Sequence, residues 1–242
     1  SNQIAVIAIM AIGMTMVIIT GGIDLSVGSL LAFSAVIAAW LIQEVGGGVE
    51  ASGAAMFLSS LAAITACGMI GAFSGTMITV FSIPPFIVTL SMMLVGSGFA
   101  YIIAQGQSIY EIPEQYKWLG HGSDAFSIPN ASVLMIGLYL LAHFVMSRTA
   151  LGRRIYAVGG NPEAARLSGV PVKKILLLVY ALSGVFAGIG GVITASQLQS
   201  GSPTYGLMFE LYVIAAVVVG GTSLSGGSGK ILGTLIGAFI IA

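Results

Sequence analysis

The chain alternates long apolar runs with short polar or glycine-rich breaks. A helix needs about 20 mainly apolar residues to cross the hydrocarbon layer of a bilayer. The pattern therefore predicts an all-α, polytopic transmembrane helical bundle that forms a single transmembrane domain over residues 1–242. Its predicted helices are 2–20, 28–43, 54–81, 84–105, 131–147, 174–197, 208–221 and 230–242.

Two of these runs, 28–43 and 208–221, are unusually short or glycine-rich. Such segments in transporters are often half-helices or re-entrant pieces that line a polar path, and we expect the same here. The sequence also begins and stops within apolar runs, so we expect native N- and C-terminal spans beyond it.

Composition agrees with a membrane protein. Hydrophobic residues make up 57% of the chain and charged residues 7%, against roughly half and a quarter in a soluble domain. The 34 glycines suit membrane helices whose backbones pack closely. A net charge of zero argues against nucleic acid as a partner, because binding phosphates requires a surplus of Lys and Arg. Lipid is the expected surrounding solvent.

The basic residues predict the orientation. Six of the eight Lys and Arg residues lie in one segment, and cytoplasmic loops of membrane proteins are enriched in these residues. Segment 148–173 is therefore the predicted cytoplasmic loop, and 106–130 the extracytoplasmic one. Counting one crossing per helix puts the glycine-rich turns 21–27 and 222–229 at the inner face. The six residues are Arg148, Arg153, Arg154, Arg166, Lys173 and Lys174.

A short internal repeat links those two turns. Residues 21–29 and 220–228 are identical at six of nine positions, and each stands between two apolar runs. Repeated units are a common way of building transporters. We expect the two copies to have the same orientation.

The sequence does not predict an enzyme. Residues 226–230 approach a phosphate-binding loop, but Leu224 and Ile231 stand where that motif requires Gly and Ser or Thr. Any ATP-driven work must then come from a partner. A serine-protease interpretation of Gly226 to Gly229 needs a base within reach of Ser228, which sequence alone does not show. Two histidines and one cysteine do not make a metal-ligand set. We therefore expect no catalytic residue, metal or cofactor.

Two carboxylates, those of Asp24 and Glu210, lie near predicted membrane depth, where a charge is costly unless it faces a cavity, a partner or a helix terminus. Each stands at the start of a predicted helix, so it can cap free N–H groups or contact a substrate. Other polar residues of the spans can line a path or can join helices by hydrogen bonds. The candidates for the translocation path are Asp24, Ser26, Thr89, Ser91, Gln197, Gln199 and Glu210.

The predicted extracytoplasmic loop is polar and aromatic. It is either a solvated loop with interfacial aromatic residues or a docking surface whose acidic residues meet basic ones of a partner. The residues concerned are Gln105, Gln107, Tyr110, Glu111, Glu114, Tyr116, Trp118 and Asp124.

A short capped helix is predicted in the basic loop. Asn161 suits an N-cap, Pro162 the first helical position and Gly169 the C-terminal stop, with Glu163 in the first turn. The preceding Gly159 and Gly160 predict a tight turn that presents this helix. The helix is either a simple connector or, as its charges suggest, a docking element.

Three stretches resemble the permease subunits of ribose-type ATP-binding-cassette importers. These are 21–29, 151–169 and 215–227, and the likeness covers nearly the whole chain. It implies a bacterial inner-membrane, multi-pass protein with three kinds of partner: a second permease subunit, a cytoplasmic ATPase pair and an extracytoplasmic sugar-binding protein. The implied activity is import of a ribose-like monosaccharide by alternating access.

Within that resemblance, Glu163-Ala164-Ala165 followed by Gly169 is similar to the loop through which such permeases touch their ATPases. The alternative left open by the residues is a secondary transporter driven by an ion gradient, although the centres of the spans lack a clear proton or sodium relay. The implied ATPase-coupling residues are Gly159, Gly160, Asn161, Pro162, Glu163, Ala164, Ala165, Arg166 and Gly169.

Overall fold

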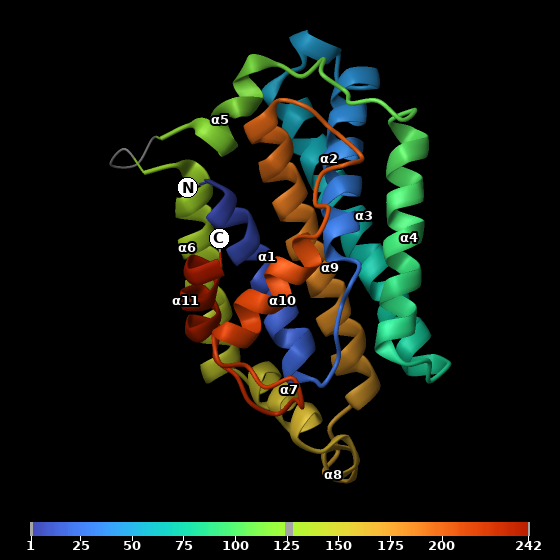
Figure 1. Ribbon diagram of the computed structural model, residues 1–242, viewed down its shortest axis with the longest axis vertical. Helices are drawn as coiled ribbons and strands as arrows, with labels where there is room; N and C mark the ends of the chain where they lie inside the picture. The colour runs from blue at the N-terminus through green and yellow to red at the C-terminus, as the bar shows by residue number, and fades with distance from the viewer. Residues whose placement is uncertain (1, 124–127, 242) are drawn as a thin grey trace.

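Helices form the regular structure of the chain in a computed structural model that describes residues 2–123 and 128–241 (Figure 1). The all-α bundle is confirmed, and each of the eight predicted spans is a helix whose ends differ from the prediction by at most two residues. The elements are α1 Asn2–Ile19, α2 Val27–Glu44, η1 Gly48–Glu50, α3 Gly53–Val80, α4 Pro85–Ile103, η2 Glu114–Tyr116, α5 Lys117–His121, α6 Asn130–Arg148, α7 Ala150–Gly160, α8 Pro162–Leu167, α9 Val172–Leu198, α10 Phe209–Val219 and α11 Ile231–Ile241.

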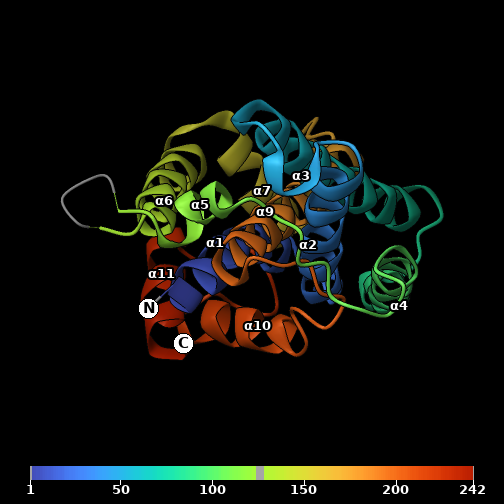
Figure 2. The same cartoon turned by 90° about the horizontal axis from the view of Figure 1, so that it is seen from above.

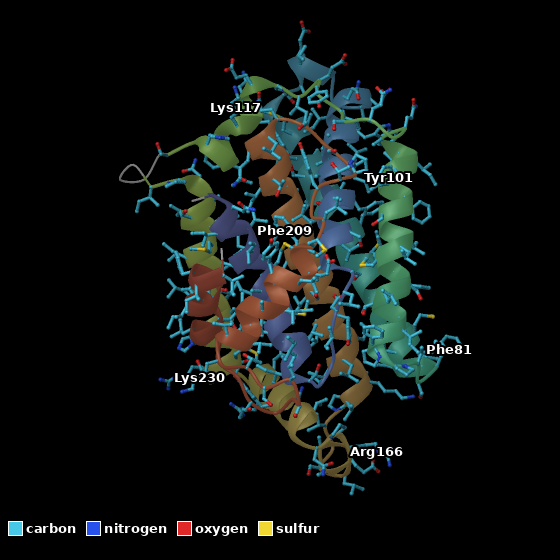
Figure 3. The ribbon with its side chains drawn as sticks, viewed as in Figure 1. Phe81, Tyr101, Lys117, Arg166, Phe209 and Lys230 are labelled. Carbon is cyan, nitrogen blue, oxygen red and sulfur yellow. The ribbon has the colours of Figure 1, made fainter. Side chains whose placement is uncertain are left out.

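The two ends of the bundle differ in charge. Helices α7 and α8 lie at the lower end of Figure 1, which we call the basic end, and α5, η1 and η2 lie at the opposite, acidic end. Figure 3 shows Arg166 and Lys230 at the basic end and Lys117 at the acidic end. Within residues 2–123 and 128–241, five helices are long and apolar enough to cross a membrane: α2, α3, α4, α6 and α9.

Helix α1 is enclosed by other helices. Its residues 5–19 are all buried, and α6, α9, α10 and α11 pack around it (Figure 2). Close approach depends on small residues: a Cβ added at Gly13 would lie 2.8 Å from the Cα of Ser183 on α9. Small residues at helix interfaces are the usual means of packing helices in lipid, where the hydrophobic effect does not drive association.

Helix α10 is a half-helix. It has 11 residues, or about 16 Å at 1.5 Å per residue, against about 30 Å of hydrocarbon. The half-helix prediction is thus confirmed for 208–221. It is wrong for 28–43, because α2 has 18 residues and is long enough to span. The extended segment 20–26 runs from the basic end toward the middle of the bundle, where α2 begins (Figure 1).

The repeated turns share one C-terminal cap. Gly21 and Gly221 have φ of 80° and 86°, and each donates its N–H to the carbonyl three residues earlier, at 2.9 Å. The next N–H bonds the carbonyl five residues earlier, which completes a Schellman motif. Gly21 therefore corresponds to Gly221, one position away from the sequence alignment. The turns meet at the basic end, where the N–H of Gly227 donates to the carbonyl of Ile19 at 2.8 Å.

Candidate functional site

The short helix α8 is capped at both ends by the residues that the sequence predicts. The side-chain oxygen of Asn161 accepts the N–H groups of Glu163 and Ala164, both at 3.0 Å. Pro162 occupies the first turn. At the other end Gly169, with φ of 81°, donates to the carbonyl of Arg166. The capping prediction is confirmed, and both ends of this six-residue helix have hydrogen-bonded caps.

Most of the surface of α8 is free for another molecule. The helix projects beyond the bundle at the basic end (Figure 1), and within it only Ala165 is buried. Glu163 and Arg166 form an ion pair at 2.5 Å, but their side chains are 68% and 69% exposed, so the pair contributes little to stability. Leu167 is 81% exposed.

The predicted tight turn at Gly159 and Gly160 is wrong. Both residues belong to α7, which Thr149 caps by accepting the N–H of Gly152, and the helix ends only where Asn161 takes an extended conformation. Gly160 has no positive φ, and a Cβ there would meet open space. Gly159 is the constrained position, because a Cβ there would overlap the carbonyl oxygen of Ile19.

This contact joins α7 to both repeated turns, and we call Ile19, Gly159 and Gly227 the glycine junction. A Cβ on Gly159 would also lie 2.7 Å from the N–H nitrogen of Gly227. The hydroxyl of Tyr156, on α7, donates to the carbonyl of Gly229 at 2.8 Å. Helix α7 therefore contacts both the end of α1 and the turn that precedes α11.

Asp24 is a buried carboxylate with three donors. Its Oδ1 accepts the N–H of Ser26 at 3.0 Å and the hydroxyl of Ser26 at 2.6 Å, and its Oδ2 accepts the hydroxyl of Ser183 at 2.7 Å. Asp24 is 1% exposed, and these bonds offset part of the loss of hydration. The expected cap on α2 itself is wrong, because Asp24 binds the residue before the helix. It fastens segment 20–26 to α9.

Glu210 lies in the first turn of α10, as the sequence predicts. A Cβ added at Gly28 would overlap its carboxylate, so the carboxylate also lies against the first turn of α2. The N-terminal ends of two helices therefore share one negative charge, an arrangement that helix dipoles favour. Phe209, at the start of α10, marks this position about halfway along the bundle in Figure 3.

The structure brings four of the seven path candidates together around the start of α2. Besides Asp24, Ser26 and Glu210, this group includes Thr89 of α4, which donates to the carbonyl of Ile23 at 3.2 Å. We call these four residues the central group.

The other three path candidates lie elsewhere. Ser91 is exposed and bonds its own helix at Ile87. Gln197 packs on Gly120, and Gln199 donates to the carbonyl of Pro113 at 3.2 Å. The two glutamines thus connect residues 106–123, which we call the acidic-end segment, to α9.

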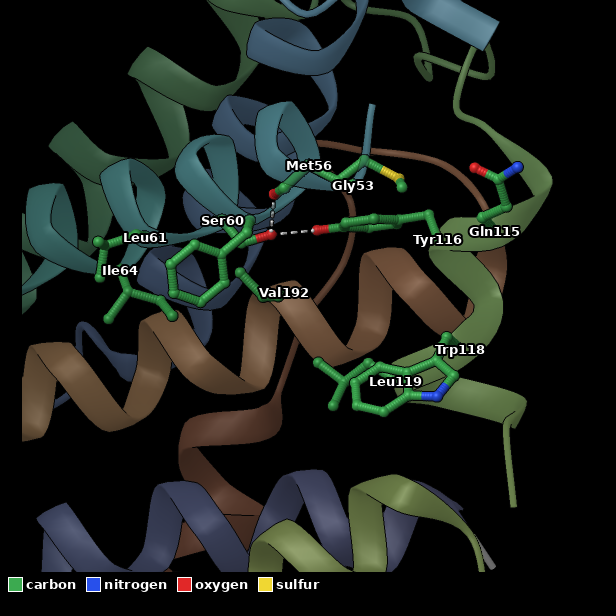
Figure 4. A pocket seen from close by; sticks show the side chains of 11 residues that line it. Gly53, Met56, Ser60, Leu61, Ile64, Gln115, Tyr116, Trp118, Leu119 and Val192 are labelled. Carbon is green, nitrogen blue, oxygen red and sulfur yellow. Dashed lines mark hydrogen bonds between the residues drawn. The ribbon is translucent and has the colours of Figure 1, made fainter. Parts of the chain in front are cut away.

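The acidic-end segment is anchored rather than loose. Tyr116 is buried and shares a 2.9 Å hydrogen bond with Ser60 of α3, and Ile109 pairs with Gly201 in an antiparallel bridge. Beside them is an apolar cavity of about 480 Å³ (Figure 4). Trp118, at its edge, is 59% exposed, which fits an interfacial aromatic residue. Asp124 lies outside the described residues.

Sequence reasoning missed two residues of these contacts, Tyr156 and Ser183, and it also missed the buried Tyr180. The last two lie three residues apart on α9, so they share a face, and Ser183 bonds Asp24. The spacing of Tyr180 and Ser183 was the available signal in the sequence. It does not show which residues they contact, because the chain has many other serines and tyrosines.

The whole chain belongs to a family of transport permeases. It matches the family described as branched-chain amino acid transport system / permease component over residues 1–242. The ribose import permease protein RbsC of Escherichia coli strain K12 is 43% identical over 99% of this chain and 73% of its own length. The RbsC of Bacillus subtilis strain 168 is 39% identical over 99% and 72%. The fructose import permease protein FruF of Bifidobacterium longum is 40% identical over 96% and 64%. No solved structure matches the chain.

Membership of this family confirms the resemblance inferred from the three motifs. The chain is a multi-pass membrane protein and a transport component rather than an enzyme.

Proposed function

We propose that this chain is the membrane-spanning subunit of an ATP-binding-cassette importer that moves a ribose-like monosaccharide across a bacterial inner membrane. One observation carries the proposal: a short helix, capped at both ends, projects from the basic end and follows directly on α7, which contacts both repeated turns at the glycine junction. The relatives named as ribose and fructose import permeases support a sugar as the cargo.

The partners follow from the two ends. The basic end faces the cytoplasm by the bias of Lys and Arg, and an ATPase docks there on α8, through residues 159–169. The anchored segment 106–123 at the acidic end receives an extracytoplasmic sugar-binding protein. A second permease subunit, identical or related, completes the translocation path.

Alternating access gives each site a role. Closure of the ATPases on ATP displaces α8 and α7, and the glycine junction transmits this movement to the end of α1 and the turn before α11. The central group lies where α2 and α10 begin, so it borders the path that opens and closes. Because a ligand shifts an equilibrium only through differential affinity for its states, the permease needs no tight sugar site.

ATP dependence tests the proposal. Proteoliposomes holding this chain with its ATPase and binding protein are loaded with ATP, and uptake of D-ribose and D-fructose is measured. We expect uptake to require ATP and to survive ionophores that collapse proton and sodium gradients. Uptake that ignores ATP and stops with the ionophores would instead establish a secondary transporter.

A further inference from the structure

A second cavity lies at the basic end, between segment 20–26, the α3–α4 turn and α9. Its volume is about 350 Å³, within the range of about 300–1,000 Å³ usual for small-molecule sites. The α3–α4 turn is marked by Phe81 in Figure 3. Gly21 and Gly22 line the cavity, and the same segment carries Asp24 and Ser26 of the central group. The cavity therefore lies on the basic-end side of the central group. Its polar side chains are those of Thr20, Thr79, Ser82, Lys173 and Tyr180.

Tyr180 supplies the unexplained group of this cavity. Its side chain is 0% exposed, and its hydroxyl has no hydrogen-bond partner among the described residues. Leaving a buried hydroxyl unpaired is unfavourable, so each such group requires an explanation. Gly22 covers it, because a Cβ there would overlap the hydroxyl oxygen. A shift of the glycine turn away from Tyr180 would expose this donor to the cavity.

The remaining polar atoms define the kind of ligand. The hydroxyls of Thr20 and Thr79 already donate to the carbonyls of Val17 and Gly75, both at 2.7 Å, so they offer lone pairs to a ligand. The carbonyls of Thr20, Gly21 and Gly22 accept no hydrogen bond from the described part of the chain. The cavity thus offers many acceptors together with three donors: the hydroxyls of Tyr180 and Ser82, and Lys173, which forms no ion pair with any described residue.

An anion suits this site poorly. Pro84 and Pro85, where α4 begins, have no N–H groups with which to bind a phosphate. The carboxylate of Asp24 lies close behind Tyr180, bound to Ser183 one turn along α9. A neutral molecule bearing several hydroxyl groups matches the mixture of acceptors and donors, because each hydroxyl can both donate and accept.

We propose that this cavity is an exit subsite for the transported monosaccharide, in which Tyr180 and Thr79 hydrogen-bond the sugar before its release into the cytoplasm. The inference rests on the proposed function and adds a place along its path. The cavity is already present, and a shift of the Gly21–Gly22 turn would complete the subsite by exposing the Tyr180 hydroxyl to it. It couples ATP hydrolysis to sugar release rather than to sugar capture.

The first test removes single hydroxyls from the full complex in proteoliposomes, with D-ribose and D-fructose as probes. Tyr180→Phe and Thr79→Val should each lower the amount of sugar moved per ATP hydrolysed by about 3- to 10-fold, as expected for one neutral hydrogen bond. Membrane abundance and stimulation of the ATPase by the loaded binding protein should be unchanged. The matched controls are Tyr139→Phe, whose hydroxyl bonds Ala8 elsewhere, and Thr65→Val, on the exposed face of α3.

The second test measures protection. In a Cys67→Ala background, Ser82→Cys should react with a maleimide from the cytoplasmic side, and D-ribose should slow the reaction during turnover. Ser147→Cys, exposed at the end of α6, should react at the same rate with or without sugar. A normal sugar-to-ATP ratio in both hydroxyl variants, or labelling of Ser82→Cys that sugar does not change, overturns the subsite. Absence of any ATP-dependent sugar uptake by the unmodified complex counts against the proposed function instead.

Discussion

Gly159 shows at the scale of one residue why a missing side chain matters. It is helical and unstrained, so its requirement is not conformational. The space that a methyl group would occupy holds the carbonyl of Ile19 and the backbone of Gly227. Its neighbour Gly160 has the same chemistry and faces open space, which makes the two glycines a natural pair for comparison.

Gly159→Ala should uncouple transport, whereas Gly160→Ala should leave it near normal. Overpacking costs about 1–3 kcal/mol, so separating α7 from the glycine junction should reduce sugar uptake by about tenfold. The measurement compares uptake with membrane abundance for both variants. Equal uptake by both would show that the junction transmits nothing.

Asp24 allows a second prediction at this scale. Asp24→Leu leaves the hydroxyls of Ser26 and Ser183 without their acceptor and should destabilise the fold by about 2–4 kcal/mol. Asp24→Asn keeps an acceptor for Ser26 and should be milder. Thermal unfolding in detergent measures both. A leucine variant as stable as the unmodified chain would mean that these bonds do not hold segment 20–26.

At the scale of elements, the important features are the caps at the ends of the helices. Three helices, α1, α8 and α10, end in the same glycine-based C-terminal cap. All three C-termini lie at the basic end of the bundle. Rigid ends make short helices suitable for transmitting movement. The N-cap of α8 is the simplest of these ends to test.

Asn161→Ala removes both cap bonds of α8, which costs about 0.5–2 kcal/mol. A six-residue helix cannot tolerate that loss, so sugar-stimulated ATP hydrolysis should fall while membrane abundance stays constant. Asn161→Asp retains the acceptor and serves as the control. If the alanine variant couples as well as the aspartate variant, the order of α8 is irrelevant to docking.

The helices and the α8 caps were predictable because each depends on neighbours in sequence: apolar run length, Asn161 before Pro162, and Gly169 after the last turn. The misses depend on contacts between distant segments. Nothing local shows that Gly159 meets Ile19, or that Ser183 bonds Asp24. Similarly, the adjacent Gly159 and Gly160 predict a turn from sequence alone. In the structure α7 continues through both glycines and ends only at Asn161.

At the scale of the whole molecule, the long axis of the bundle separates two chemically distinct ends. Cysteines at Ser168 and Ser123 stand at these ends, and both positions are exposed. In a background lacking Cys67, an impermeant thiol reagent should label only the Ser123 variant in intact cells, and only the Ser168 variant in inverted vesicles. Labelling of both from one side would refute the assigned orientation.

The enclosure of α1 also bears on how the protein is made. Its partners α9, α10 and α11 are the last helices of the described chain to leave the ribosome, and the hydroxyl of Thr15 in α1 meets that of Thr234 in α11 at 2.8 Å. Until those helices are inserted, the surfaces of α1 around Gly13 and Thr15 are exposed to lipid or to the insertion machinery. Packing around α1 is therefore complete only after α11 has been inserted, and a chain interrupted before α11 leaves uncovered the surface of α1 that α11 contacts.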